Sequence, residues 1–357
     1  MTQCSPSAMY VREPALYGDV KKQIAKLWGI AARLTHHPAP NPVSLTRECF
    51  KLLSSNEYVV SEKTDGVRYL LLISQFSDGK RPFAVLVDRA FKMYQIQICA
   101  PAYIYKGSLF DGELVWDNES GFMKFLIFDV VAFAGKSVKS YHLMQRYEII
   151  NQTFLSSAEW NKSHIKDYAV AADTASGFAA QKKIVCIPEP NNLLFLYSKP
   201  CVPFNLFGSL LRTKTTHASD GFIMTPVRCP VLQNSHQSMF KWKHSPTIDI
   251  KVQCNQSYYC SDGGQCVELI HAFPEYTFDF DALNGVLKHR GTDFIIEVTL
   301  FEKSAAEFSC RFHRMRTDKK YPNDRRTIAN IISEVQQNVS VEELILLSEN
   351  AVSSAAQ

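Results

Sequence analysis

The feature that most constrains the fold is a change in the spacing of apolar residues near residue 58. Before it, Leu16–Leu34 has helical spacing and His36–Pro42 contains three prolines, which predicts a helix and then a loop. After it, apolar residues gather in short runs rich in β-branched and aromatic side chains, which is typical of strands. These runs are Tyr58–Ser61, Val67–Ile73, Phe83–Val87, Leu109–Trp116, Lys124–Phe133, Leu193–Tyr197, Gly221–Thr225 and Met239–Lys243. We therefore expect an α+β fold of antiparallel sheets flanked by helices.

Two further segments complete the first domain, which we predict to span residues 1–243. Tyr141–Leu155 is predicted to be helical, and the polar, Ala- and Ser-rich stretch Ser156–Gln181 is predicted to form surface connections. His244-Ser245-Pro246 then has the composition of a hinge.

A smaller β-domain over residues 244–338 is predicted after the hinge. Its strands are expected around Ile248–Val252, Gln265–Ala272 and Phe294–Phe301. The apolar residues Ile328, Ile331, Ile332 and Val335 share one helical face, and Ser340 with Glu343 forms a capping box for a last helix. We expect residues 339–357 to pack back toward the first domain.

Composition excludes several classes of protein. With 46% hydrophobic residues the chain can bury a large core, and a net charge of +4 is too small for bulk coating of nucleic acid. No apolar run approaches the ~20 residues of a membrane span, and Met1–Asp19 lacks the apolar core of a signal peptide. The ten cysteines form no C-x-x-C pair, which indicates a reducing compartment. Cys260 and Cys266 flank Gly263-Gly264, where we favour a structural loop over half a metal site.

One lysine stands out, in the run Glu62-Lys63-Thr64-Asp65-Gly66-Val67-Arg68. Asp65-Gly66 between two strand runs predicts a hairpin turn, with Lys63 at a strand end facing a cleft. A lysine amine attacks phosphorus only when neutral, and deprotonation at pH 7 costs about 4 to 5 kcal/mol from a pKa of about 10.4. A divalent cation or other cations in a desolvated cleft would lower that pKa. The alternative for this run alone is a solvated hairpin tip.

Five later motifs follow this lysine in a fixed order. They are Phe110-Asp111-Gly112-Glu113, Phe128-Asp129, Ser219-Asp220-Gly221-Phe222-Ile223, Phe240-Lys241-Trp242-Lys243 and Arg314-Met315-Arg316-Thr317-Asp318-Lys319. With the lysine run they make the chain resemble the mRNA capping guanylyltransferases, members of the covalent nucleotidyltransferase superfamily that also contains polynucleotide ligases. Features of the capping branch are Asn41-Pro42-Val43-Ser44-Leu45, Thr247-Ile248-Asp249 and Pro322-Asn323 after the last motif. The resemblance implies a nucleotidyltransferase domain followed by a C-terminal OB-fold domain and terminal helices.

The resemblance also implies a reaction centred on Lys63. This residue would attack the α-phosphate of GTP, release pyrophosphate and hold GMP, which then passes to a 5′-diphosphate RNA end to form a 5′-5′ triphosphate cap. Arg68 and Glu113 match residues that contact the ribose, and Arg89 matches one near the ribose and phosphates. A surface ion pair is the alternative for Arg68 and Glu113.

Other matched residues would hold the base. Phe128 matches the aromatic that stacks on the purine, and Ile223 matches the aliphatic residue on the opposite face. Lys199 in Ser198-Lys199-Pro200 resembles the lysine that contacts the guanine carbonyl. Stacking itself does not select guanine. The alternative for Phe128 is a core residue, although strand alternation would place it on the opposite face from Asp129.

The remaining matched residues would act on phosphates. Asp220 matches the carboxylate that binds the catalytic metal, for which oxygen ligands favour Mg²⁺ or Mn²⁺. Strand alternation turns Lys241 and Lys243 to one face, away from two aromatics, with a solvated basic edge as the alternative. Arg316, Asp318 and Lys319 would contact the β- and γ-phosphates when the second domain closes.

Two competing functions stay open at this stage. An ATP-dependent polynucleotide ligase would use the same lysine chemistry, and a catalytically dead RNA-end or partner-binding module would retain the fold. About forty residues precede the first matched segment, so we expect a separate RNA triphosphatase to supply the diphosphate end. From family behaviour we also expect a nuclear enzyme that docks on the phosphorylated C-terminal tail of RNA polymerase II and does not bind a membrane.

Overall fold

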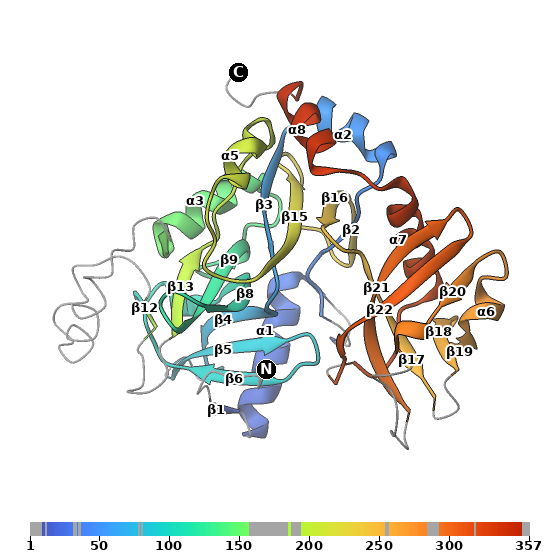
Figure 1. The fold of residues 1–357 in the computed structure, drawn as a ribbon. Coiled ribbons are helices and arrows are strands. Elements are labelled where there is room, and N and C mark those ends of the chain that lie inside the picture. The colour runs from blue at the N-terminus through green and yellow to red at the C-terminus, as the bar shows by residue number, and fades with distance from the viewer. Residues whose placement is uncertain are drawn as a thin grey trace. The chain divides into compact units, whose positions relative to one another are not determined.

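The structure is a computed structural model (Figure 1). It describes residues 9–10, 13–30, 34, 37–77, 79, 81–156, 185–186, 194–253, 257–283, 293–317 and 319–351. The predicted site residue Asp318 and nearly all of the polar stretch predicted at Ser156–Gln181 lie outside these residues. None of the described helices has the length and apolar character that crossing a membrane requires.

The chain forms two compact units. The first comprises Met1–Val43, Ser55–Met239 and Ser348–Gln357, and the second comprises Ser44–Ser54 and Phe240–Leu347. The division after Met239 falls just before the predicted hinge, and a short early segment joins the second unit. The packing of residues 339–357 toward the first domain stays a prediction.

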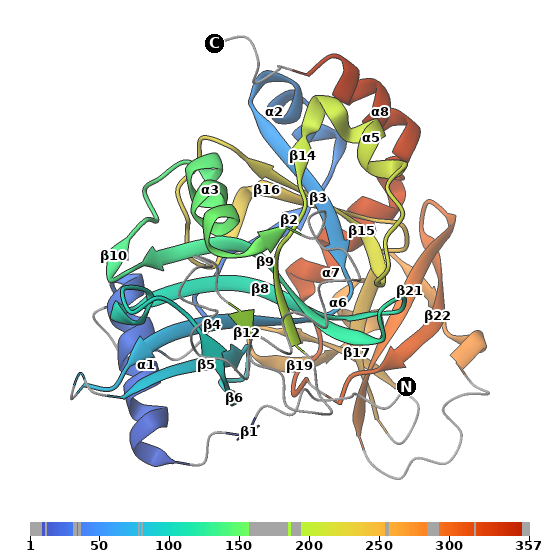
Figure 2. The ribbon, with the colours of Figure 1, turned by 90° about the vertical axis from the view of Figure 1, so that its left-hand side faces the viewer.

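The first unit contains a large sheet whose strand order, within the described part of the chain, is β1-β6-β5-β4-β8-β9-β13-β11, with β10 paired to β9 (Figure 2). The strands are β1 (Met9–Tyr10), β4 (Val67–Gln75), β5 (Pro82–Asp88), β6 (Met93–Ile96), β8 (Ser108–Asp117), β9 (Phe122–Phe133), β10 (Lys136–Ser137), β11 (Leu155–Ser156) and β13 (Leu194–Ser198). Strand β13 runs parallel to both β9 and β11, so the prediction of purely antiparallel sheets is wrong at this edge. A separate pair joins β7 (Ile98–Cys99) and β12 (Val185–Cys186).

Helices cover both faces of this sheet. Helix α1 (Pro14–Trp28) ends at Gly29, whose φ of 71° is left-handed, and packs its buried face on Leu70 and Leu72 of β4. Helix α3 (Leu143–Thr153) contributes Ile150 to the opposite cluster, which contains Leu71 and Ile73. Because both faces are buried, β4 is a continuous apolar run rather than an alternating one.

A second sheet contains the predicted nucleophile. Its order is β14-β3-β15-β16-β2. The elements are β2 (Asn41–Ser44), β3 (Tyr58–Thr64), β14 (Val202–Pro203), β15 (Ser219–Pro226) and β16 (Ser235–Lys243), with helix α5 (Phe207–Leu211) and a short 3₁₀ turn at Phe204–Leu206. Another 3₁₀ turn, Ile104–Lys106, packs on β4 of the large sheet.

The link at Asp65-Gly66 corrects the predicted hairpin. Strand β3 pairs with β14 and β15, whereas β4 pairs with β5 and β8, so the link carries the chain from one sheet to the other. Glycine is needed at position 66 because a Cβ there would clash with the Leu114 carbonyl oxygen and lie 2.7 Å from Val115 Cγ1. Close approach of β8, and not hairpin geometry, therefore explains Gly66.

The second unit is built on a sheet of order β19-β18-β17-β21-β22-β20. Its strands are β17 (Thr247–Val252), β18 (Tyr258–Asp262), β19 (Gln265–Glu268), β20 (Thr277–Asp279), β21 (Phe294–Ser304) and β22 (Glu307–Met315), with a 3₁₀ turn at Asp281–Leu283. Strands β18 and β19 form a hairpin that turns at Gly263-Gly264, with Cys260 buried in the core. The predicted strand Gln265–Ala272 is half wrong, because Leu269–Ala272 forms helix α6.

Helices complete the second unit. Helix α7 (Arg325–Gln337) begins at the cap Asp324 and buries Ile328, Ile331 and Ile332 against the sheet, as its periodicity predicts. Most of α2 (Phe50–Ser55) and α8 (Val341–Glu349) also belongs to this unit. The predicted capping box is confirmed, since Ser340 and Glu343 exchange hydrogen bonds between side chain and backbone.

Candidate active site

Lys63 lies near the end of β3 and forms an ion pair with Asp220. Its Nζ is 2.6 Å from Asp220 Oδ1, and the two side chains are 22% and 34% exposed. Both groups are therefore accessible to a ligand. Of the residues predicted for the site, these two are in direct contact.

A β-bulge directs Asp220 toward Lys63. In the pairing of β15 with β3, Ser219 lies opposite Thr64 and Gly221 lies opposite Lys63, so the register skips Asp220. A bulge inserts one residue into one strand and re-aims side chains, and bulges are common beside active sites. The carboxylate consequently reaches across the strand pair to the lysine of the neighbouring strand.

Arg68, near the start of β4, is fixed mainly by a carboxylate and a backbone carbonyl. Its Nε and Nη2 donate to the two oxygens of the buried Asp111 at 2.9 and 2.5 Å, and its Nη1 donates to the Pro40 carbonyl at 2.8 Å. Burial opposes the positive charge, but the Asp111 carboxylate raises the pKa of Arg68. Arg68 therefore forms a buried ion pair with Asp111, and not the surface pair with Glu113 that was the alternative from the sequence.

Glu113 instead belongs to a chain of hydrogen bonds that runs through Thr64. The Thr64 hydroxyl donates to Glu113 and accepts from Lys199 Nζ at 3.1 Å. Lys199 is only 5% exposed. Burial lowers the pKa of its ammonium group, Glu113 opposes that effect and Lys63 adds to it. The ammonium group of Lys199 is thus a desolvated donor near the predicted nucleophile, Lys63.

Phe128 is half-buried and faces the two cations of the site. The ring centroid is 5.4 Å from Arg68 Cζ and 5.4 Å from Lys199 Nζ. A second bulge is responsible, because the register of β9 against β8 passes from Asp129 to Ile127 and skips Phe128. Regular alternation, which the sequence prediction assumed, does not hold here: Ile127 and Val130 pack in the same core cluster. Phe128 is thus half-buried rather than part of this core cluster, and its stacking role on the purine stays a prediction.

Two predicted nucleotide contacts lie at the edges of this group. Arg89 follows β5, is exposed, and donates to Asn41 Oδ1 at 3.3 Å. The same oxygen accepts from Arg68 at 3.4 Å, so Asn41 joins the two arginines. Ile223 is half-buried on β15 opposite Ser61, and its role on the purine stays a prediction.

The second unit holds its predicted phosphate-binding cations on one carboxylate. Arg316 Nη1 donates to Asp249 Oδ1 at 2.7 Å, and Lys319 Nζ donates to Asp249 Oδ2. Asn323 fixes the same strand position, since its Oδ1 accepts from the Asp249 amide at 2.7 Å. Asp249 therefore orients both cations.

The family is decided by matches that cover almost the whole chain. The mRNA capping enzyme catalytic domain matches residues 10–245, and the mRNA capping enzyme C-terminal domain matches residues 222–345. The chain belongs to the mRNA capping enzymes. The prediction of an mRNA guanylyltransferase, a nucleotidyltransferase, is thereby confirmed. The helices and sheets of the structure confirm the α+β class.

Relatives of this capping enzyme come from distant eukaryotes. An mRNA-capping enzyme subunit alpha of Schizosaccharomyces pombe is 25% identical over 91% of this chain and 83% of that protein. An mRNA-capping enzyme of Caenorhabditis elegans is 25% identical over 86% of this chain, which spans only about half (48%) of that protein. A solved mycobacterial DNA ligase D complexed with ATP and MES matches 79% of this chain and 95% of that chain, at 14% identity and a TM-score of 0.40.

The paired lysines of this capping enzyme follow the predicted alternation on β16. Phe240 and Trp242 are buried, whereas Lys241 and Lys243 are half-buried. The Trp242 indole N–H donates to the Val339 carbonyl at 2.7 Å, which anchors the strand within the second unit. Lys243 Nζ donates to the Thr247 hydroxyl at 3.1 Å.

A carboxylate that sequence reasoning did not single out lies next to these residues. Glu297 on β21 accepts from the Thr247 hydroxyl at 2.6 Å and from Arg314 Nε at 2.7 Å. Burial alone would raise the pKa of Glu297, but the Thr247 hydrogen bond and the Arg314 charge outweigh it and lower the pKa to about 2. The capping enzyme therefore keeps a buried negative charge here over the whole physiological pH range.

Other groups in the first unit were also missed as site residues. Thr64 was visible in the lysine run but was given no role. His37 lies within electrostatic range of Asp111 and Arg68, and burial lowers its pKa to about 4. No hydrogen-bond partner for its Nε2 is found among the described residues. His37 could have been identified only by knowing that the neighbouring Asn41-Pro42 segment lies close to the site. No local sequence pattern reveals that proximity.

Proposed function

We propose that this capping enzyme forms a covalent lysyl-GMP intermediate on Lys63 and passes the GMP to the 5′-diphosphate end of RNA. The observation that carries the proposal is the group of Lys63, Asp220, Arg68 and Lys199 around one accessible amine. Amine, carboxylate and flanking cations are the groups that attack on a nucleotide phosphate requires.

Each step of the proposed reaction exchanges one bond to the α-phosphorus. In the first step, the neutral Lys63 amine attacks the α-phosphorus of GTP and an N–P bond forms. The bond from the α-phosphorus to the bridging oxygen breaks, and pyrophosphate leaves with that electron pair. The amine loses a proton to solvent. In the second, a terminal β-phosphate oxygen of the RNA attacks. The N–P bond then breaks, and the departing amine takes up a proton.

The other residues of the first unit are assigned by their chemistry. Glu113 and Arg68 suit the ribose and the phosphates, and Arg89 adds a cation at the edge. The Phe128 ring suits the purine, with Ile223 on its opposite face, because an aromatic ring supplies a large stacking surface. Lys199, a buried donor next to that ring, suits the guanine carbonyl oxygen.

A divalent cation, Mg²⁺ or Mn²⁺, fits a site at Asp220. Mg²⁺ is commonly held by one or two carboxylates together with substrate phosphates. Within the described residues no group of three or more metal-binding side chains is found, so the protein side of the proposed site is the single carboxylate of Asp220. When bound, the cation would neutralise charge on the α-phosphate. Asp220 would then exchange its contact with Lys63 for the ion.

The second unit would supply charge to the leaving group. The family resemblance supports an OB fold for this unit and a role for Arg316, Asp318 and Lys319 on the β- and γ-phosphates. Lys241 and Lys243 would serve the α-phosphate. To take this role, Arg316 and Lys319 would have to leave the Asp249 carboxylate and donate to phosphate oxygens instead. Carboxylate and phosphate oxygens are chemically similar acceptors.

Labelling with GTP tests the proposal directly. The full chain is incubated with Mg²⁺ and GTP radiolabelled at the α-phosphate, and is then denatured. We expect label to stay on the wild type and on Lys136→Ala, which removes an exposed lysine of β10, but not on Lys63→Ala or Lys63→Arg, because arginine is not deprotonated in proteins. Label from ATP and not from GTP would favour the ligase alternative and overturn the proposal.

The cellular setting follows from the proposed reaction. We propose a nuclear enzyme that works with a separate RNA triphosphatase and docks on the phosphorylated tail of RNA polymerase II, since the acceptor must carry a 5′-diphosphate and be newly made. A pull-down with phosphorylated tail peptide tests the docking, and failure to retain the chain would count against it.

A further inference from the structure

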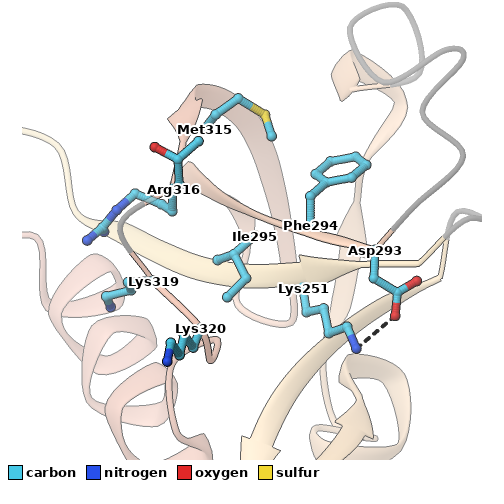
Figure 3. A pocket seen from close by; sticks show the side chains of 9 residues that line it. Lys251, Asp293, Phe294, Ile295, Met315, Arg316, Lys319 and Lys320 are labelled. Atoms are coloured by element: carbon cyan, nitrogen blue, oxygen red, sulfur yellow. Dashed lines mark ion pairs between the residues drawn. The ribbon is translucent and has the colours of Figure 1, made fainter. Parts of the chain in front are cut away.

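A basic pocket of about 350 Å³ opens on the second unit, beside the residues already assigned to the nucleotide (Figure 3). Its cationic side chains come from β17 (Lys251), from the end of β22 (Arg316) and from the segment that follows (Lys319 and Lys320). Figure 3 shows the Ile295 side chain between Lys320 and Lys251, with Lys319 beside Lys320. Cations from separate elements thus surround an apolar floor.

The pocket keeps positive charge that could bind an anion other than the nucleotide phosphates. Arg316 and Lys319 are held by Asp249, and Lys251 forms a 2.8 Å ion pair with Asp293. An ammonium group has three donors, so Lys251 keeps capacity for a second acceptor. Lys320 is exposed, and within the described part of the chain no acidic side chain is found paired with it. The local charge of the pocket is therefore positive even with its internal pairs formed.

An exposed aromatic side chain follows Lys320 directly in the chain. Tyr321 is 70% exposed, the highest value among the large hydrophobic side chains that the structure describes. Removing such a ring from water is favourable, yet most of its surface stays exposed. A basic pocket followed directly in the chain by an exposed aromatic ring offers the two kinds of group that bind single-stranded nucleic acid: cations for the backbone and a ring for stacking on a base.

We propose that Lys320, Lys251 and Tyr321 form a subsite for the single-stranded RNA acceptor. The two lysines contact backbone phosphates, and the Tyr321 ring stacks on a base of the RNA chain beyond its reacting 5′ end. This inference rests on the proposed function, because that function supplies the acceptor. Lys251 and Lys320 lie outside the matched motifs, so their removal should spare the reaction with GTP.

The test separates the two steps of the reaction in the full chain. Lys63 labelling by GTP is measured first, and GMP transfer is then measured to a 5′-diphosphate dinucleotide and to a 5′-diphosphate RNA of about 20 nucleotides. We expect Lys320→Ala and Tyr321→Ala to leave labelling and dinucleotide transfer unchanged and to raise the KM for the long RNA about tenfold. Tyr321→Phe should retain the wild-type value, because stacking needs the ring and not the hydroxyl group.

Salt dependence and a matched control exclude a general charge effect. Each phosphate contact on a single strand contributes about 0.7 to the slope of log affinity against log salt. Lys320→Ala should reduce that slope by about this amount, measured by binding of unreactive single-stranded RNA, whereas Lys136→Ala on β10 should not change it.

Three outcomes would overturn the subsite. They are equal effects on long and short acceptors, no effect on either, and weakened GTP labelling, which would assign the pocket to the nucleotide phosphates. Failure of the wild type to label with GTP would instead refute the proposed function, and the binding assay with unreactive RNA would still decide whether the pocket holds RNA.

Discussion

Replacement of Glu297 by glutamine tests the electrostatics of the second unit. The pKa of Glu297 falls from 4.5 to about 2 on folding, because the Thr247 hydrogen bond and the Arg314 charge outweigh burial. At about 1.36 kcal/mol per pKa unit, this difference corresponds to about 3 kcal/mol of stability at neutral pH. Glutamine preserves the shape of the side chain and removes the charge, so it should forfeit an energy of this order.

The dependence on pH has a definite sign. A carboxyl group whose pKa is lowered on folding stabilises the protein fully above its unfolded pKa, and this stability is lost as pH falls through the folded pKa. Here the window runs from 4.5 down to about 2. The difference in unfolding free energy between wild type and Glu297→Gln should thus be about 3 kcal/mol at pH 7 and about 1.4 kcal/mol at pH 3.

Urea denaturation read by pulse proteolysis measures this difference, since fragment sizes distinguish the two units. Glu302→Gln, which removes an exposed carboxylate from the same strand, is the matched control and should change little. A difference that stays constant from pH 7 to pH 3, or that is below about 1 kcal/mol at pH 7, would refute the reasoning.

Three further changes test the first unit and the proposed leaving-group contacts. Gly66→Ala should destabilise the protein by about 2 to 3 kcal/mol in urea denaturation, because the new Cβ would clash with a carbonyl oxygen of β8. The control Gly208→Ala on α5 places its Cβ in open space and should be neutral or slightly stabilising. Arg68→Lys should lower the rate of Lys63 labelling at least about tenfold, because an ammonium group does not reproduce the bidentate pair of the guanidinium group with Asp111. The control Arg228→Lys, in a pair whose arginine is exposed, should retain the full rate. Lys319→Ala should block labelling with an unchanged circular dichroism spectrum, and full activity would argue against its phosphate role.

Local sequence patterns were sufficient for most of the secondary structure. The runs around Tyr58, Val67 and Leu109 form strands as predicted, and the apolar stripe Ile328–Ile332 is the buried face of α7. These features depend on the period of side chains along one element, which a sequence displays directly.

Features that depend on pairing between distant strands were not predictable in the same way. Asp65-Gly66 has the composition of a hairpin turn, yet its strands join different sheets, because β3 finds partners after residue 200. The parallel pairing of β13 with β9 likewise depends on contact between strands that are far apart in the sequence. The resemblance supplied the predicted site residues, and its motifs contain Asp111 and Asp249, but it gave these two carboxylates no role in holding the cations.

The two bulges have a consequence for how this active site can be lost. Asp220 and Phe128 each occupy the extra residue of a strand, so deletion of either would restore regular pairing with the neighbouring strand. Such a deletion removes one chemical group and leaves the rest of the ladder in register. Among descendants of this protein, a single-codon deletion at either position would therefore yield a chain that still folds and still resembles its relatives, but lacks a group that the proposed reaction requires. Sequence identity alone would not reveal that loss.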